Sequence, residues 1–572
     1  MRAMEDELAR SMDKLRLEGL DKLYFLAYQV DDAVTTETDA TFGGLTQSDQ
    51  YRTRTLRVEV RVGSPQLDNT NFLTAPSDPT GLGASRRSQL PLEDNYLEIR
   101  RKIWLATDAA FKDALETISR KRAALQNKTL TESLPDFAAQ APAKIFEAPP
   151  GPPPDLGRLS DLARGLSALF RSMPQVASSS VRLRCRSVYA RYANSEGSRF
   201  MRATPRAEFI ASARGYAPDG YPLGDFTARF ATGLDGLPSR EQMADSIRAL
   251  GGRMADLQKG SLLATYNGPV LFEGEAAAEL LAQAFLPSLA AARAPVTDNP
   301  QMEMFLEKTG NPFEDKIGAR VLPAFLDLAD DPTAGSYGSE PLLGVYKVDN
   351  DGVPAARTVL VEHGILKALV STRDPAHAAL KSTGNRRGAS AAPSNVILST
   401  DEGLKDKDLR RKLLALAKDR GLDYGIVIRR LGDPLLLSGD ENPMASMMRA
   451  MGGGGGDQIS VEPAIAAYKL YNDGHEELLR NVEVGDLSAG SFKDIAAVSR
   501  SCSAVTVPFQ QTGLSAMLGR MAALMGDGGS ATPLVSIVTP DLLFEELTLS
   551  KPEGEIVRPP VAGHPFFSKD EK

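Results

Sequence analysis

The side chains that most often hold metals or attack bonds are scarce in this chain of 572 residues. Its only histidines and cysteines are His363, His377, His475, His564, Cys185 and Cys502. A zinc site needs about four nitrogen, sulfur or oxygen ligands that converge as a tetrahedron. No two histidines are close enough in sequence to share a helix face, and neither cysteine is near a histidine. The spacing therefore indicates no metal site, and two cysteines provide no disulfide framework.

Other short catalytic motifs are also absent from the sequence. There is no G-x-S-x-G elbow, Walker loop or dinucleotide fingerprint, and the run GGGGGD lacks the Lys-Ser/Thr pair that a phosphate loop needs. A Ser-His-Asp triad assembles only in space, so the sequence leaves it open. The composition favours a binding or scaffolding protein over a hydrolase.

Three glutamates cluster where a strand turns into a helix. The segment GPVLFEGEAAAELLAQAFLPSLAAARA, residues 268–294, has a short apolar run followed by a helical pattern. Glu273 and Glu275 lie at the expected helix start, where unpaired N–H groups and the positive end of the helix dipole favour carboxylates. Glu279 lies one turn later, and we expect it to face water.

The loop KSTGNRRG, residues 381–388, is the best candidate for a binding surface. Asn385 can fix a turn, and Arg386 and Arg387 can clamp a peptide carboxylate or carbonyl groups. Ser382 completes this candidate substrate-binding set. The alternative is a loop held by its own Gly-Asn turn, with both arginines in water.

The elements that must position these residues indicate an α+β fold. The segment LRVEVRV, residues 56–62, alternates as a half-buried strand does, and residues 93–128 form a long helical pattern with Trp104 on its apolar stripe. A Pro-rich connector follows at residues 147–157. We expect two sheet-based lobes, an N-terminal α+β domain at 1–265 and a C-terminal β-rich domain at 266–572. A helical arm with its connector, about 93–160, is inserted in the first lobe.

The second half is richer in strand patterns. Residues 342–370 alternate around the turns Asp351-Gly352 and His363-Gly364, which predicts a meander of three strands. A helix and strand follow within 408–431, and a hairpin has its tip at Asn472-Asp473-Gly474. Five consecutive glycines and a Met cluster at about 438–458 predict a flexible insertion.

Charge and hydropathy exclude two partner classes. The net charge is −8, whereas a nucleic-acid binder needs clustered Lys and Arg in excess. No apolar run approaches the ~20 residues that span a bilayer, and the first 30 residues form a charged amphipathic pattern rather than a signal peptide. We therefore predict no nucleic acid, no membrane span and a cytoplasmic location; an export signal already removed would leave no trace.

Several segments resemble one family in their order along the chain. These are GPVLFEGEAAAELLAQAF, PFEDKIGARVLPAFLDLADDPT, DNDGVPAARTVLVEHGILKALV, KSTGNRRGASAAPSNVILS, NVEVGDLSAGSFKDIAAVS and VSIVTPDLLFEELTL. The pattern is similar to the TldD/PmbA family of peptidases, and KSTGNRRG with PSNVIL is its most specific element. Residues 34–63 and 193–225 resemble the family's N-terminal domain more loosely, whereas the helical arm and the Gly/Met insertion are departures.

The resemblance also implies where a metal site would lie. TldD-like members place an H-E-x-x-x-H motif on the corner helix, with a third zinc ligand from a C-terminal cysteine. Those His-Glu-His positions fall at Leu281, Ala282 and Leu286 here, and the cysteine position falls near Met525 and Gly526. A shifted register does not restore the motif, because no histidine precedes His363.

The functional hypothesis follows from the absence of the zinc-binding motif at these positions. The chain resembles the PmbA (TldE) branch, which lacks the motif and pairs with a zinc-bearing subunit. We expect a metal-free protein without a cofactor that binds peptides or acts as a scaffold, as a homodimer or as a heterodimer with a zinc-bearing TldD-like subunit. Two alternatives are a stand-alone peptide-binding or assembly protein, and a hydrolase with relocated non-zinc chemistry.

Overall fold

The computed structural model describes residues 1–73, 85–126, 134–308, 310–376, 381–437, 459, 461–485, 487–509, 532–552 and 566–567. Some sequence predictions fall outside these residues. They are the flexible insertion at 438–458, the expected cysteine position near Met525 and Gly526, and two of the four histidines, His377 and His564.

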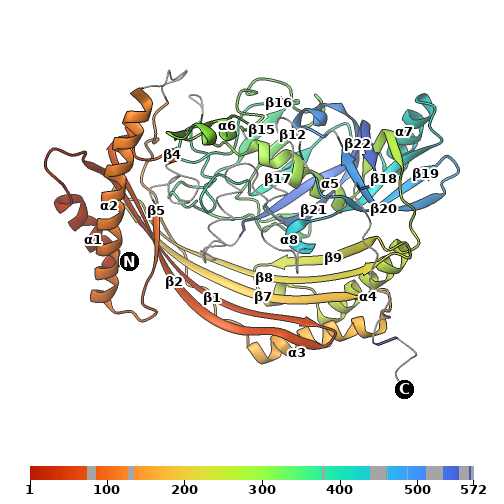
Figure 1. Ribbon diagram of the computed structural model, residues 1–572, viewed down its shortest axis with the longest axis horizontal. Coiled ribbons are helices and arrows are strands. Elements are labelled where there is room, and N and C mark those ends of the chain that lie inside the picture. The colour runs from red at the N-terminus through yellow and green to blue at the C-terminus, as the bar shows by residue number, and fades with distance from the viewer. Residues whose placement is uncertain are drawn as a thin grey trace.

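Two large sheets dominate the fold, one built from each half of the chain (Figure 1). The first has eight strands and curves, and the second half of the chain lies above its concave side. The second sheet has ten strands. This arrangement confirms the predicted α+β fold with two sheet-based lobes.

The first sheet has the strand order β3-β2-β1-β7-β8-β6, with β5 paired to β2 and β9 to β8. Its strands are β1 (Leu23–Thr41), β2 (Gly44–Ser64), β3 (Leu67–Asp68), β5 (Ser85–Gln89), β6 (Lys144–Phe146), β7 (Ser178–Asn194), β8 (Arg199–Tyr216) and β9 (Pro222–Ala231). The turn between β1 and β2 places Phe42 and Gly43 at φ of 45° and 82°, as tight hairpins require. A short parallel pair, β4 (Phe72–Leu73) with β11 (Val296–Thr297), joins the two halves of the chain.

Helices cover the outer face of this sheet. They are α1 (Arg2–Lys14), α2 (Tyr96–Gln126), α3 (Leu156–Ser167), α4 (Arg240–Leu257) and the 3-10 turns η1 (Ala168–Ser172) and η2 (Leu234–Gly236). The Ser239 hydroxyl and the Gln242 side chain form a capping box that begins α4. Figure 1 shows α1 and α2 at one end of the molecule and α3 and α4 beneath the sheet.

The long helix is confirmed as α2, but the predicted position of Trp104 is wrong. The buried face of α2 contains Ile103, Ala110, Phe111 and Ile118, which pack against β2 and α1. Trp104 is 42% exposed. The helix has apolar residues on two faces, and only the contact with the sheet decides which face is buried.

The strand predicted at 56–62 is part of β2, but it is not half-buried. Its valines face α2, and its charged residues Arg57, Glu59 and Arg61 are buried as well, at 8%, 5% and 1% exposure. Alternation alone assigns the charged face to water. Here the second half of the chain covers that face.

The second sheet has the order β10-β18-β19-β20-β22-β17-β12-β15-β16, with β21 paired to β22. Its strands are β10 (Thr265–Phe272), β12 (Asp327–Asp330), β15 (Thr358–Glu362), β16 (Ile365–Leu366), β17 (Asn395–Ser399), β18 (Tyr424–Leu431), β19 (Ala464–Tyr471), β20 (Glu476–Gly485), β21 (Ile495–Pro508) and β22 (Leu534–Ser550). A separate hairpin joins β13 (Ser336–Tyr337) and β14 (Glu340–Pro341). The helices of this half are α5 (Glu275–Leu280), α6 (Pro300–Lys308), α7 (Asp406–Asp419), α8 (Pro434–Leu437), the π-helical turn η3 (Leu281–Phe285) and the 3-10 turns η4 (Leu286–Leu289) and η5 (Ala489–Asp494).

The predicted three-strand meander is only partly correct. His363 and Gly364 form the tip of the β15–β16 hairpin, as expected. Residues 342–357 form turns and irregular structure instead of a strand. Arg57, Arg202 and Tyr192 of the first sheet bind carbonyls of this segment, and Ser536 and Asn395 of the second half accept two of its amides, so these groups are paired without a neighbouring strand.

The predicted domain division at 265/266 stays a prediction. The first sheet ends its last strand at Ala231, and the second begins at Thr265. None of the helices in the described ranges is both long and apolar enough to cross a membrane.

Candidate functional site

The strand-to-helix corner joins β10 to α5 through Gly274. This glycine has a φ of 58°, which L side chains rarely adopt, and its amide donates to Asp541 Oδ1 at 2.8 Å. The chain then continues through α5, the π-helical turn η3 and the 3-10 turn η4. The sequence prediction of a strand followed directly by a helix is confirmed.

The positions matched to the metal motif lie inside the hydrophobic core. Leu281, Ala282 and Leu286 are 0%, 6% and 0% exposed and belong to the core of the second half. Next to them, the Phe285 ring contacts the rings of Phe313 and Phe492.

These side chains do not fit a zinc ion. Aliphatic groups have no lone pair to donate, and zinc needs nitrogen, sulfur or oxygen ligands. Within the described residues, no group of three or more His, Cys, Asp and Glu side chains is arranged to hold a metal. We therefore derive no chemical step through zinc at this corner.

The first two corner glutamates are held by arginines. Glu273 forms a two-point ion pair with Arg410 at 2.7 and 2.8 Å and also binds Arg429 at 3.0 Å. Glu275 accepts from Arg430 at 2.8 Å. Their position at the helix start agrees with the dipole interpretation, but each also ties the corner to β18 or α7.

The prediction that Glu279 faces water is wrong. Glu279 is 5% exposed, and its Oε2 accepts the backbone amide of Leu431 at 2.7 Å. Burial raises the pKa of Glu279 well above its usual range, against the opposing effect of Arg430. The end of β18 passes over this helix, and the carboxyl group accepts a hydrogen bond from the Leu431 amide there.

The corner is also linked to the first lobe. Arg430 contacts Asp225 of β9 at 3.0 Å, and Arg253 of α4 contacts the other oxygen of Asp225 at 2.5 Å. Asp225 is fully buried. The carboxylates around this corner thus connect neighbouring elements and stabilise the fold.

A second cluster lies where the loop at residues 381–388 meets the first sheet. Arg386 is 6% exposed, and its guanidinium lies 2.8 Å from Asp351 and 3.7 Å from Glu59 of β2. Asn385 is fully buried and donates to Asp330 at 2.7 Å. The interpretation of a loop with both arginines in water is therefore wrong for Arg386.

The remaining residues of the predicted substrate-binding set lie beside this cluster. Arg387 donates to the carbonyls of Pro393 and Leu534 and stacks over the Tyr346 ring. The Ser382 hydroxyl is half-buried and accepts the amide of Gly384 at 3.3 Å. Contact of Ser382, Asn385, Arg386 and Arg387 with a peptide stays a prediction.

The same loop region includes the predicted turn at Asp351-Gly352, whose burial the sequence did not indicate. Asp349 accepts the amides of Asp351 and Val353 at 2.8 Å each, and its other oxygen accepts the amide of Arg386 at 3.0 Å. Asp351 has one carboxylate oxygen that is buried without a hydrogen-bond partner among the described residues. The only sequence signal was the polar run DND, which is typical of an exposed turn.

Three side chains of the first sheet hold this turn in place. Arg57 donates to the carbonyl of Asn350 at 3.0 Å, and Arg202 donates to the side-chain oxygen of Asn350 at 2.6 Å. The Tyr192 hydroxyl donates to the carbonyl of Asp351 at 3.3 Å. The charged face of the first sheet is thus a docking surface for loops of the second half.

Burial and neighbouring charges shift the acids of this interface in opposite directions. Burial alone would raise the pKa of Glu59, but Arg386, Arg61 and Arg57 lower it to about 2. Burial, together with the Asp351 carboxylate, raises the pKa of Asp349 to about 7. Asp349 is therefore a group of this interface that titrates near neutral pH.

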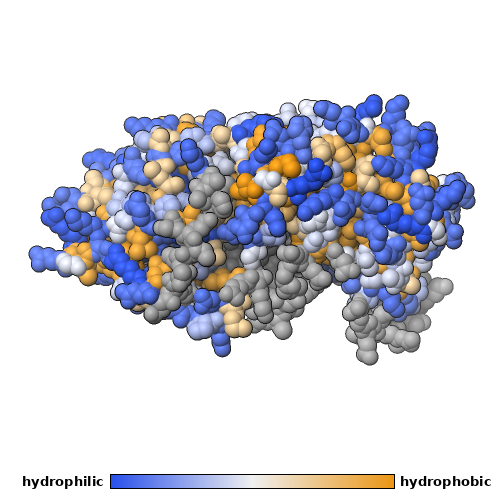
Figure 2. All heavy atoms as spheres, turned by 90° about the horizontal axis from the view of Figure 1, so that it is seen from above, coloured by the Kyte–Doolittle hydropathy of each residue, from blue (hydrophilic) through white to orange (hydrophobic). Residues whose placement is uncertain are grey.

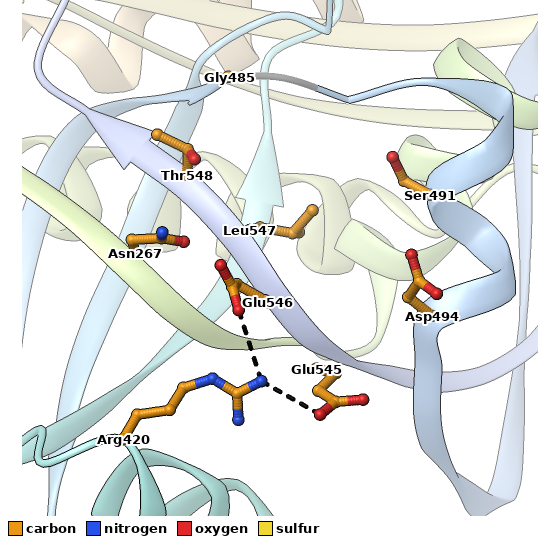
Figure 3. Close-up of a pocket in the computed structure, with 9 residues that line it drawn as sticks. All are labelled: Asn267, Arg420, Gly485, Ser491, Asp494, Glu545, Glu546, Leu547 and Thr548. Atoms are coloured by element: carbon orange, nitrogen blue, oxygen red, sulfur yellow. Dashed lines mark hydrogen bonds and ion pairs between the residues drawn. The ribbon is translucent and has the colours of Figure 1, made fainter.

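A pocket of about 390 Å³ lies elsewhere in the second half, between β10, η5 and β22. Figure 3 shows the Arg420 side chain pointing to Glu545 and Glu546, with ion pairs of 3.1 and 3.5 Å. Ser491 and Asp494 line the side formed by η5. Both glutamates are more than half exposed, so the pocket lacks the buried, shifted acid that acid–base chemistry needs.

Comparison with known proteins places the corner and the loop in one module. Residues 265–432, from the first residue of β10 to just beyond β18, match the model of the PmbA/TldA metallopeptidase C-terminal domain. This segment belongs to the TldD/PmbA family. This confirms the resemblance found in the sequence, whereas assignment to the branch without the zinc motif stays a prediction.

Two curated relatives that match part of this chain are named as metalloproteases. The one from Methanothermobacter thermautotrophicus is 35% identical over 97 residues, 17% of this chain and 20% of the relative. The one from Methanocaldococcus jannaschii is 40% identical over 65 residues, 11% of this chain and 13% of the relative. The matched segments thus span a fifth or less of the relatives' length.

Two solved structures share the fold of this chain. TldE from Thermococcus kodakarensis has a TM-score of 0.56 at 14% identity and covers 96% of this chain and 100% of its own. A proposed modulator of a DNA gyrase from Thermotoga maritima has a TM-score of 0.59 at 14% identity, over 96% of this chain and 99% of its own. At this identity the similarity concerns the fold alone.

Proposed function

We propose that this chain is a non-catalytic, metal-free TldD/PmbA subunit that binds peptides or acts as a scaffold. It works with a zinc-bearing TldD-like subunit or as a homodimer. The observation that carries the proposal is the aliphatic core at Leu281, Ala282 and Leu286, where the family resemblance puts H-E-x-x-x-H.

The other acids at the corner support the same proposal. A peptidase that uses a glutamate as a base needs a carboxylate free to take a proton from water. Glu273 and Glu275 are paired with arginines, and Glu279 accepts a backbone amide. The structure uses all three as supports for the fold.

Peptide binding is proposed on the side where the two lobes meet. Between Cys502 and Pro508, the pairings that the structure describes for β21 are with β22, on one side of the strand. An extended peptide that adds to such an edge gains main-chain hydrogen bonds without any catalytic residue. Ser382 and Arg387 lie on the neighbouring loop, which Arg387 connects to the first residue of β22.

The test uses the full chain, alone and with a zinc-bearing relative from the same host. We expect much less than one zinc per chain by elemental analysis, binding of a labelled unfolded peptide by fluorescence anisotropy, and no cleavage by the chain alone. Cleavage should appear on addition of the zinc-bearing relative. Stoichiometric zinc together with chelator-sensitive cleavage by the chain alone would contradict the proposal.

A further inference from the structure

The outer face of α2 carries exposed apolar side chains at one end of the molecule. Leu97, Trp104 and Leu105 are 74%, 42% and 42% exposed, outside the face of the helix that packs on β2 and α1. Figure 2 shows apolar residues scattered among polar ones at this end of the molecule. Trp104 is the only tryptophan in the chain, and tryptophan is enriched at protein interfaces.

These residues belong to a stripe whose spacing is the same in both directions along the helix. The stripe consists of Leu97, Arg101, Trp104, Leu105, Asp108 and Lys112. Its spacings of four, three, one, three and four residues keep all six side chains on one side of a helix. The midpoint is the peptide bond between Trp104 and Leu105.

We call these six residues the α2 stripe. The charges of one α2 stripe are complementary to those of a second, antiparallel α2 stripe. Arg101 and Asp108 have opposite charge and lie at equal distance from the midpoint. Their side chains are 51% and 37% exposed, and among the residues that the structure describes their ion pairs are local, to Glu98 at 2.7 Å and to Lys112 at 2.7 Å. A two-fold axis through the midpoint places each Arg101 opposite Asp108 of the partner subunit.

We propose that α2 pairs antiparallel with α2 of a second copy of this chain. Trp104 then packs beside Trp104 of the partner subunit, with the two Leu105 side chains next to them and an Arg101–Asp108 pair on each side. The apolar centre is small, so the dissociation constant is on the order of micromolar. This inference deepens the proposed function, because it names the surface used by the homodimer, but it needs neither peptide nor zinc.

The test measures self-association of the full chain by sedimentation velocity, from about 1 to 100 μM. We expect a dimer, and a blue shift of the single tryptophan's emission as the concentration rises. Trp104→Glu should weaken the dimer at least about tenfold, because it places two like charges at the centre. Met304→Glu on α6 is the matched control, since Met304 is 62% exposed and lies outside the stripe, and it should leave association unchanged.

A charge exchange tests the antiparallel register without touching the apolar centre. Arg101→Asp and Asp108→Arg should each weaken the dimer about tenfold, because each places like charges opposite one another. The double variant should restore association to within about threefold of the original chain. A chain that stays monomeric, that associates only with a zinc-bearing relative, or whose dimer is unaffected by these variants overturns the inference. Zinc content and peptide binding are measured separately, so failure here is distinguishable from failure of the proposed function.

Discussion

Arg386 and Glu59, from opposite halves of the chain, lie 3.7 Å apart in a buried interface that also contains Asp351. Arg386 brings a positive charge to two acids that have almost no access to water, since Glu59 is 5% and Asp351 is 4% exposed. Burial of one such charge without its partner costs several kcal/mol. The contact therefore couples the position of the loop at 381–388 to the first sheet.

Replacement of Arg386 should destabilise the protein strongly. Arg386→Ala leaves Glu59 and Asp351 buried without their shared partner, and we expect a loss of about 3–5 kcal/mol in the free energy of unfolding. Arg411→Ala is the control, because Arg411 is 78% exposed and its ion pair with Asp408 lies on one helix; it should cost less than about 1 kcal/mol. Chemical denaturation of both variants measures the free energy of unfolding. Equal losses in the two variants would show that the buried contact stabilises the protein no more than the exposed ion pair does.

Asp349 should make stability depend on pH in a defined direction. Its pKa is raised to about 7 in the folded chain, so the folded state holds a proton that the unfolded state has already lost. Its contribution is fully present below the unfolded pKa of about 4 and decreases as the pH rises to about 7, by up to about 1.4 kcal/mol per pH unit. Urea denaturation between these limits should show a smaller decrease for Asp349→Asn than for the original chain. If the free energy of unfolding falls equally with pH in the variant and the original chain, the Asp349 carboxyl group is not the source of the pH dependence.

Glu279 offers a matched pair of substitutions at the corner. The raised pKa indicates a neutral carboxyl group, so Glu279→Gln retains an oxygen for the Leu431 amide and should cost less than about 1 kcal/mol. Glu279→Ala removes this acceptor and opens a cavity, and it should cost about 2–4 kcal/mol. Thermal unfolding of the two variants measures the difference. An alanine variant as stable as the glutamine variant would contradict the buried hydrogen bond.

Chelation should leave the stability of the corner unchanged. Aliphatic packing around Leu281 and Leu286 holds this helix, so o-phenanthroline should not lower the Tm of the full chain. Leu286→Ala should lower the free energy of unfolding by about 2–5 kcal/mol, because Leu286 is fully buried. A Tm that falls with the chelator would mean that a bound metal stabilises the fold.

Much of the secondary structure could be predicted from local patterns. The long helix α2, the capping of α4 at Ser239, the β19–β20 hairpin and the turn at β10 into α5 each follow from spacing and turn residues within a short window. The sequence also carried enough of the family pattern to identify the TldD/PmbA family from the corner and the loop together. The sequence alone also shows that aliphatic residues, Leu281, Ala282 and Leu286, stand at the positions matched to the zinc motif.

Burial of polar groups could not be predicted in this way. The charged residues of β2 alternate with valines, as on a strand face in water; they are Arg57, Glu59 and Arg61. The turn with Asp349 and Asp351 has the sequence of an exposed turn. In the structure the turn packs on this strand face, so the charged residues of both are buried. Glu279 was expected in water for the same reason, since the strand end that covers it lies far along the chain. Periodicity reports which residues share a face, whereas a contact between distant segments decides whether that face meets solvent or protein. The sequence by itself determined the elements and the aliphatic corner, and the tertiary structure decided which charges are buried, because burial depends on what packs above them.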